Sequence, residues 1–186
     1  AQPPLVVELL APGEGPVTAL AGKGITFDSG GIDLKRDQGE LAWMKTDMAA
    51  AASVAAAVVA TAALRPGLAL HAILPVAENM PGPTALRPGD VVTHPGGRTT
   101  EVVDTDCEGR LVLADALAWL AETAAARLID VGTLTDLLRP FAGDVPWVHI
   151  DNGSGAWLER DAGAWPAGPT GTPLRALVRW LTTAAP

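Results

Sequence analysis

The stretch Lys23–Gly31, which reads KGITFDSGG, decides the fold expected for this chain. It joins a short extended segment, Ile25–Phe27, to a loop whose paired glycines allow backbone conformations that other residues rarely adopt. Asp28 stands where the extended segment ends, and the strand ends of α/β sheets are where binding sites are usually built. The stretch therefore predicts a strand that delivers Asp28 into a polar loop.

A second polar stretch, Asp104–Arg110, reads DTDCEGR and follows the end of another apolar strand at Val102-Val103. Asp106 and Glu108 are two positions apart. In an extended segment this spacing would put both carboxylates on one face. We therefore expect this stretch to present two acidic groups to the same place.

Carboxylates in such apolar surroundings must find cations or lose their charge. Lysine and arginine side chains supply part of that compensation, but four carboxylates at one place would more naturally hold divalent metal ions. Two neighbouring ions need shared carboxylates to offset their repulsion. Oxygen ligands without His or Cys favour Mn²⁺ or Mg²⁺, and Zn²⁺ remains a candidate. The sequence thus indicates a two-metal hydrolase, with these candidate ligands: Asp28, Asp47, Asp106 and Glu108.

Strands and helices are expected to alternate along the chain, which predicts an α/β fold. The expected architecture is one three-layer domain, residues 1–186, with a central mixed sheet flanked by helices. Residues 5–10 and 17–21 read as strands of a hairpin, because a Pro- and Gly-rich connection separates them. Asp47 is a candidate cap for the first helix. The remaining strands are expected at 25–27, 69–75, 128–131 and 145–150, and the helices at 48–64, 110–125 and 173–182.

Composition limits the classes of partner. The 186 residues carry a net charge of −8, which argues against nucleic acid because phosphate binding needs a basic face. The single Cys107 fits a reducing compartment. We see no signal peptide at the first residues, and the apolar run 48–64 is shorter than a typical membrane span. We therefore expect a cytoplasmic protein that binds no membrane.

Two long motifs, Gly22–Gly31 and Asp104–Leu111, closely resemble those of the leucyl aminopeptidases, the cytosol aminopeptidase family of metallopeptidases. The resemblance extends through 44–48, 78–81, 87–90 and 132–135, and it resumes at 146–151. It implies an enzyme that uses two divalent metal ions to release N-terminal residues, preferably leucine-like ones, from peptides. It also implies a homo-oligomer, since the family forms hexamers.

The resemblance implies a role for each matching residue. Asp28 and Glu108 would bridge the two metals, and Lys35 would polarise the scissile carbonyl. Arg110 would hold a bicarbonate ion that acts as general base. Met44 matches a residue of the pocket for the first side chain. The full expected set comprises the metal ligands Lys23, Asp28, Asp47, Asp106 and Glu108, the catalytic residues Lys35 and Arg110, and the substrate-binding residues Met44, Thr133 and Leu134.

The chain also departs from the family pattern. Cys107 stands where the family usually has Ala, and Asp104 where it has Asn. The family has several dozen further residues between Thr135 and the segment that begins at Leu137, so we expect an internal deletion near 136–137 that removes part of the catalytic domain. The family's separate N-terminal domain is not expected here either. An alternative function is therefore a non-catalytic or weakly active metal-binding fragment, which acts only in assembly or has no native role.

Overall fold

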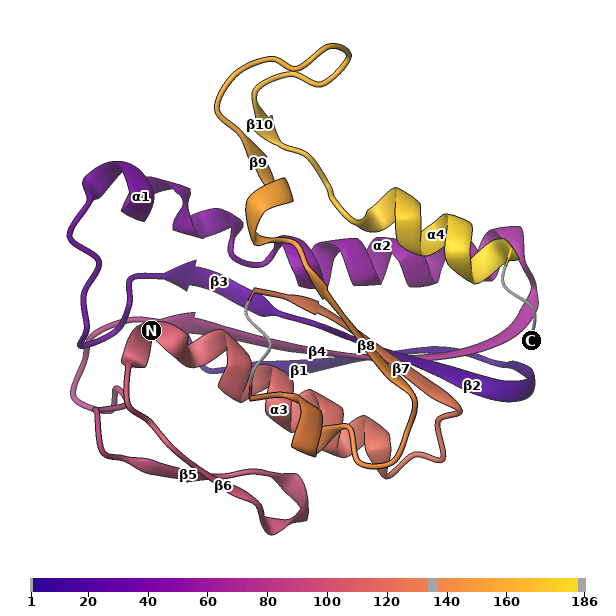
Figure 1. The fold of residues 1–186 in the computed structure, drawn as a ribbon, viewed down its shortest axis with the longest axis horizontal. Coiled ribbons are helices and arrows are strands. Elements are labelled where there is room, and N and C mark those ends of the chain that lie inside the picture. Colours follow the sequence, from indigo (N-terminus) through magenta and orange to yellow (C-terminus); the bar gives the residue numbers. More distant parts are fainter. Residues whose placement is uncertain (1, 134–136, 184–186) are drawn as a thin grey trace.

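A six-stranded mixed sheet forms the centre of the computed structural model, which describes residues 2–133 and 137–183 (Figure 1). The strand order is β1-β4-β2-β7-β8, and β3 also pairs with β4. The strands are β1 (Leu5–Ala11), β2 (Gly13–Gly22), β3 (Gly24–Asp28), β4 (Gly67–Asn79), β5 (Val91–Thr93), β6 (Thr99–Glu101), β7 (Arg127–Gly132), β8 (Trp147–Asp151), β9 (Trp157–Leu158) and β10 (Gly168–Pro169). The α-helices are α1 (Gln38–Trp43), α2 (Ala49–Leu64), α3 (Glu108–Ala121) and α4 (Leu174–Thr183). Short 3-10 helices are η1 (Met44–Thr46), η2 (Pro95–Gly97), η3 (Thr105–Cys107), η4 (Arg139–Phe141) and η5 (Gly153–Gly155).

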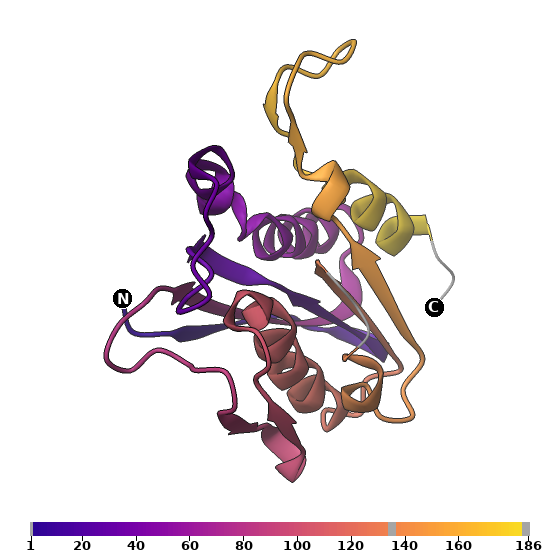
Figure 2. The same ribbon diagram turned by 60° about the vertical axis from the view of Figure 1, so that its left-hand side comes forward.

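Helices cover both faces of the sheet. Helices α2 and α4 lie on one face and α3 lies on the other, as the two views in Figures 1 and 2 show. The first face buries Leu20 and Val131 against the helices, and the second buries Ala21 and Leu128 against α3. Because successive side chains of a strand point to opposite faces, each strand contributes to both cores. The expected three-layer α/β architecture is confirmed.

The long strand β4 organises the sheet, and it corrects one expectation. β1 and β2 do not form a hairpin. Instead β1 pairs antiparallel with β4, and β2 and then β3 pair parallel with the other edge of β4. The physical reason is that β4 is apolar over most of its length and buried on both faces, so it takes a central position with partners on both edges. The turn-rich connection at Pro12 therefore leads around the end of β4.

Helix α2 begins against the junction between β2 and β3. Its first turn donates a hydrogen bond from Ala51 N to Lys23 O at 2.9 Å. Asp47 does not cap the helix as expected, because the cap position is Met48 and no side chain caps this end. Helix α2 can lie this close to the end of β2 because residue 22 is glycine. A Cβ atom at Gly22 would lie 2.8 Å from Ala51 Cα. The backbone of Lys23, rather than the side chain of Asp47, thus serves the start of α2.

The helical run Gln38–Leu64 is long and apolar enough to cross a membrane by length and composition alone. Within it, α2 packs against the sheet and α4, and Val54 and Ala57 are completely buried. The apolar character of α2 is therefore explained by its place in the core.

We predict that Gly22→Ala lowers the free energy of unfolding by about 1–3 kcal/mol, because the added methyl group overlaps the backbone of α2. Urea unfolding measures the change. Gly82→Ala is the matched control, since nothing lies within 4 Å of a Cβ atom there, and it should change the stability by less than about 0.5 kcal/mol. Equal stabilities for the two variants would contradict the close packing of α2 on β2.

Candidate metal centre

The acidic residues meet at the carboxyl ends of the parallel strands. Asp28 is the last residue of β3 and Asn79 the last residue of β4, while Thr133 directly follows β7. Glu108 is the first residue of α3, which starts at the same edge of the sheet. In α/β folds this edge is where ligands bind. The fold therefore brings together groups from four separate segments.

Lys23 sits at the point where the chain leaves β2 and enters β3. Its N–H still bonds to Val131 O of β7 at 3.0 Å, whereas β3 beyond it pairs with β4. The buried ammonium group lies 2.7 Å from Asp47 Oδ2 and 3.2 Å from Glu108 Oε1. The Lys23 side chain passes directly over Gly109, where a Cβ atom would lie 2.2 Å from Lys23 Cε. Glycine at 109 is thus what lets the lysine reach both carboxylates.

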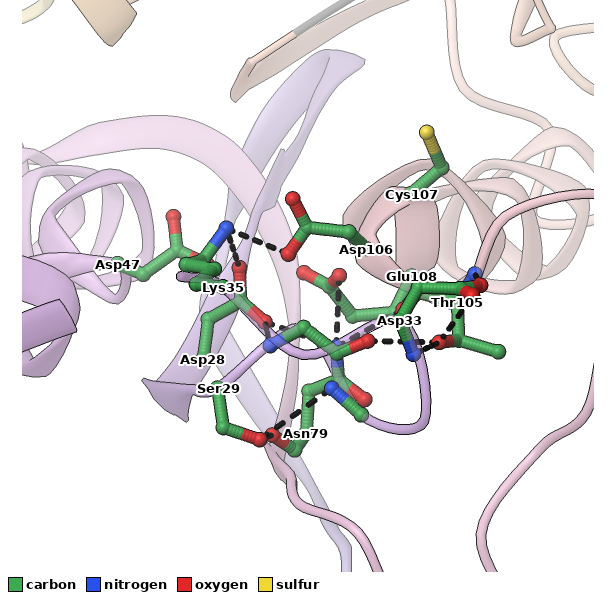
Figure 3. Close-up of polar contacts among 12 residues, drawn as sticks. Asp28, Ser29, Asp33, Lys35, Asp47, Asn79, Thr105, Asp106, Cys107 and Glu108 are labelled. Atoms are coloured by element: carbon green, nitrogen blue, oxygen red, sulfur yellow. Dashed lines mark hydrogen bonds and ion pairs between the residues drawn. The ribbon is translucent and has the colours of Figure 1, made fainter. Parts of the chain in front are cut away.

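Lys35 holds a second pair of carboxylates, as Figure 3 shows. Its ammonium group lies 3.0 Å from Asp28 Oδ2 and makes a short ion pair with Asp106. Asp28 is buried, whereas the side chain of Asp106 is one-third exposed. Lys35 therefore contacts two acidic groups of the cluster, and its expected role at the scissile carbonyl remains a prediction.

Asn79 connects the two acidic stretches, a role that the sequence did not predict. Its amide nitrogen lies 2.8 Å from Asp28 Oδ1, 3.0 Å from Glu108 Oε2 and 2.9 Å from Thr105 O. The amide carries two hydrogens, so it serves two of these three acceptors at once. The signal available in the sequence was its position, at the end of an apolar strand, like that of Asp28.

The loop after Asp28 is fixed to η3 by Asp33. Its carboxylate accepts hydrogen bonds from Thr105 N at 2.9 Å and Thr105 Oγ1 at 3.2 Å. Asp33 N donates to Thr105 Oγ1 at 2.9 Å in return. This reciprocal contact places Lys35 beside Asp106. Asp33 was also missed, because only the folded loop brings it to Thr105.

The second acidic stretch is helical, not extended as expected. Asp106 lies in η3, whose start is capped by Asp104 through a 2.8 Å bond from Asp106 N, and α3 then begins at Glu108 rather than Arg110. The expectation failed because a capping aspartate and a following run of helix formers favour helix over strand. Even so, ligand atoms of Asp28, Asp106 and Glu108 all lie within 4.8 Å of one another.

Burial and charge pairing shift the pKa values in this cluster. Burial raises the pKa of Asp47 and of Glu108, and the nearby Lys23 ammonium offsets only part of that rise. For Lys23, burial lowers the pKa, but its ion pairs with Asp47 and Glu108 outweigh burial and raise it overall. For Lys35, burial also lowers the pKa, but the hydrogen bonds to Asp106 and Asp28 outweigh burial and raise the pKa overall. Both lysines are therefore cationic in this arrangement and neutralise part of the negative charge of the carboxylates.

The donor set fits divalent cations. Asp47 Oδ2 and Glu108 Oε1 are buried, and the cation that approaches them is the Lys23 ammonium, at 2.7 Å and 3.2 Å. Buried carboxylate oxygens are costly unless a cation approaches them, so a metal ion that displaced the Lys23 proton would have to take over this compensation. Several carboxylates and one amine at one place suit Mn²⁺, Zn²⁺ or Mg²⁺. A metal here would require that Lys23 lose its proton before its nitrogen could bind.

A cavity of about 170 Å³ adjoins the cluster. Lys23 and Asp47 lie on its polar side, and Met44 and Thr133 line it as well. The structure thus places two of the three expected substrate-binding residues on a cavity that Lys23 and Asp47 also line. The third, Leu134, lies outside the described residues.

Arg110 is placed differently. Its Nη2 donates to Cys107 Sγ at 3.3 Å, and both residues line a hollow with Asp104. Figure 3 shows the Cys107 side chain pointing away from the carboxylates. Burial raises the pKa of the Cys107 thiol, which disfavours a nucleophilic thiolate. The role expected for Arg110 as an anion holder remains a prediction.

The parallel strands of this mixed sheet bring buried carboxylates and a lysine together at their carboxyl ends, so the chain is an α/β domain with a candidate metal site. The chain belongs to the cytosol aminopeptidase family: the family's catalytic-domain sequence model matches residues 1–140.

Similar proteins agree with this assignment. A probable cytosol aminopeptidase of Solibacter usitatus (strain Ellin6076) is 33% identical over 253 residues, which cover 96% of this chain and 52% of the relative. The bottromycin maturation enzyme BotP in complex with Mn is 32% identical and superposes with a TM-score of 0.90, over 98% of this chain and 56% of that one. The cytosol aminopeptidase from Coxiella burnetii is 27% identical and superposes with a TM-score of 0.78. The superposition covers 99% of this chain and 56% of that one. The chain thus spans about half the length of the curated relatives it matches.

We predict that Asn79→Ala lowers the free energy of unfolding of the metal-free protein by about 1–3 kcal/mol, because Asp28 and Glu108 then lose a buried donor. Urea unfolding in the presence of a chelator measures this. A stability equal to that of the unsubstituted chain would show that the amide does not hold the two carboxylates together.

We also predict that Mn²⁺ or Zn²⁺ raises the melting temperature, by an amount equivalent to about 2.7 kcal/mol at a hundredfold excess over the dissociation constant. The gain should be larger at about pH 8 than at about pH 5. Because the folded-state pKa values of Asp47 and Glu108 are raised, their contribution to metal-free stability is present at low pH and lost as the pH rises through those values. A bound cation reverses that loss by favouring the ionised carboxylates. A melting curve that does not respond to metal at either pH would refute the site.

Proposed function

We propose that this chain is a dinuclear metal-dependent aminopeptidase that releases leucine-like apolar residues from the N-termini of peptides. One observation carries the proposal: the carboxylates of Asp28, Asp106 and Glu108 converge within 4.8 Å, beside the Lys23–Asp47 pair. Membership of the cytosol aminopeptidase family supports the same activity. Mn²⁺ and Zn²⁺ are the leading metals, and the relative that holds Mn supports the former.

The residues divide into those that hold metal and those that meet the substrate. Lys23, Asp28, Asp47, Asp106 and Glu108 would hold two ions, with Asp28 and Glu108 shared between them. When bound, such ions supply Lewis-acid polarisation and lower the pKa of water to near neutral. Lys35 already lies against Asp28 and Asp106, so a small movement of its ammonium would bring it to a peptide carbonyl. There it would stabilise the negative charge that develops on the oxygen.

The adjoining cavity gives a place for the first side chain of the substrate. Its volume of about 170 Å³ is below the roughly 300–1,000 Å³ of whole-ligand pockets, so it suits one side chain. Met44 supplies an apolar contact there, and Thr133 lies on the wall near Lys23, 3.4 Å from its ammonium. An N-terminal residue in this cavity would present its scissile bond to the carboxylate cluster.

The alternative function is a weakly active or non-catalytic metal-binding fragment. The aligned stretch of 253 residues in the Solibacter relative is longer than the whole 186-residue chain, so that relative contains residues without a counterpart here. This supports the internal deletion that we propose near 136–137. We also propose that the aminopeptidase forms a homo-oligomer and is cytoplasmic. The name of the relatives, cytosol aminopeptidase, supports the location.

Hydrolysis of leucyl-p-nitroanilide by the Mn²⁺-loaded chain separates the two functions. Turnover that depends on metal supports the enzyme. Full metal occupancy without turnover supports the fragment.

We predict that Glu108→Gln loses most of its bound metal, whereas Lys35→Ala keeps it and loses about 10²–10³-fold in kcat, the cost of removing one oxyanion donor. The reason is that Glu108 is proposed as a shared ligand and Lys35 as a substrate contact. Elemental analysis and kinetics on the same two samples measure both quantities. If both variants lost metal equally, the division of roles would be wrong.

A further inference from the structure

The cavity beside the metal centre has an aromatic wall that the family motifs do not explain. Trp43, at the end of α1, stacks on Trp157 of β9 with ring centroids 5.8 Å apart and an interplanar angle of 23°. Both rings line the cavity. Trp157 lies beyond residue 140, where the match to the family's sequence model ends. The two tryptophans therefore form one aromatic wall of the cavity from segments far apart in the chain.

This stacked pair is only partly covered. Trp43 is 39% exposed, and Trp157 is also partly exposed. Aromatic rings of this size are favourable binding surfaces because a further ring can pack on them with an offset or edge-on geometry. Because both residues line the cavity, a side chain bound there would contact them.

The rest of the cavity suits an aromatic ring as well. Met44 lines it, and a methionine sulfur makes favourable contacts with ring edges. Gly153 also lines the cavity and packs closely against Thr133, where a Cβ atom would lie 3.1 Å from Thr133 Cγ2. The charged side chains that line the cavity, Lys23 and Asp47, are paired with each other. The cavity thus offers an aromatic surface and a methionine contact beside one ion pair.

We propose that Trp43 and Trp157 are specificity-determining residues that make the site favour peptides with N-terminal phenylalanine, tyrosine or tryptophan over N-terminal leucine. The proposal rests on the aminopeptidase function proposed above and changes its preferred N-terminal residue from a leucine-like to an aromatic one. A leucine side chain would gain burial in the same cavity, but only an aromatic side chain adds the ring-to-ring contact.

The test compares phenylalanyl- and leucyl-p-nitroanilide with the Mn²⁺-loaded chain and with its Trp157→Leu variant. We expect the unsubstituted chain to have the higher kcat/KM for the phenylalanyl substrate. In Trp157→Leu the ratio of the two kcat/KM values should fall about two- to twelvefold, the range that one aromatic contact is worth. Trp157→Phe, which keeps a ring, should retain most of the preference. Trp119→Leu is the control, because Trp119 is also a partly exposed tryptophan (45%) but lies on α3 and does not line the cavity, so the ratio should not change in that variant.

Binding of free L-phenylalanine and L-leucine, measured by calorimetry, gives a readout that needs no turnover. Suppose that no form hydrolyses either substrate, but the ratio of the two dissociation constants shifts in Trp157→Leu. This result would support the aromatic wall and overturn the proposed enzyme activity. Hydrolysis with an unchanged ratio in Trp157→Leu would overturn the aromatic wall and leave the enzyme activity standing. Neither hydrolysis nor a shift in binding would overturn both.

Discussion

The buried ammonium of Lys23, held between Asp47 and Glu108, is the contact on which the rest of the site depends. It lies where the chain passes from β2 to β3, and its own backbone carbonyl receives the first turn of α2. One residue thus fixes the start of a helix and the position of two carboxylates. An isolated charge in such surroundings would be costly, so each member of the group stabilises the others.

The remaining carboxylates are compensated in the same way. Lys35 neutralises Asp28 and Asp106, and Asn79 donates to Asp28 and Glu108. In the metal-free state the two lysines carry the positive charge that the acidic groups require. Entry of divalent cations would replace part of that charge. Lys23 would then exchange its role as counter-ion for one as ligand, while Lys35 would become available to a substrate.

The carboxylate cluster and the adjoining cavity are built from different parts of the chain. The carboxylates and Lys23 come from the region before Arg110, which the family's sequence model covers. The cavity beside them is completed by residues after β8, including Gly153 and Trp157. Figure 1 shows this later segment, with β9, rising from β8 on the side of the sheet that carries α1 and α2. The metal centre is therefore defined by the sheet, whereas the pocket also needs a later segment to fold back against α1 and η1.

The sequence by itself determined the layered α/β class, most strand and helix positions and the candidate carboxylates, because hydrophobic patterning and motif residues are local properties. It did not determine that β4 would separate β1 from β2, since strand pairing depends on which apolar strand the whole core buries most completely. It gave Asp47 as a cap, whereas in the structure Lys23 draws that carboxylate into an ion pair. Asp33 and Gly109 carry no local signal of their roles, and Asn79 carries only its position at the end of an apolar strand. Each acts through a partner distant in sequence, Thr105, Lys23 and Asp28 respectively, and only the tertiary structure brings those partners within reach.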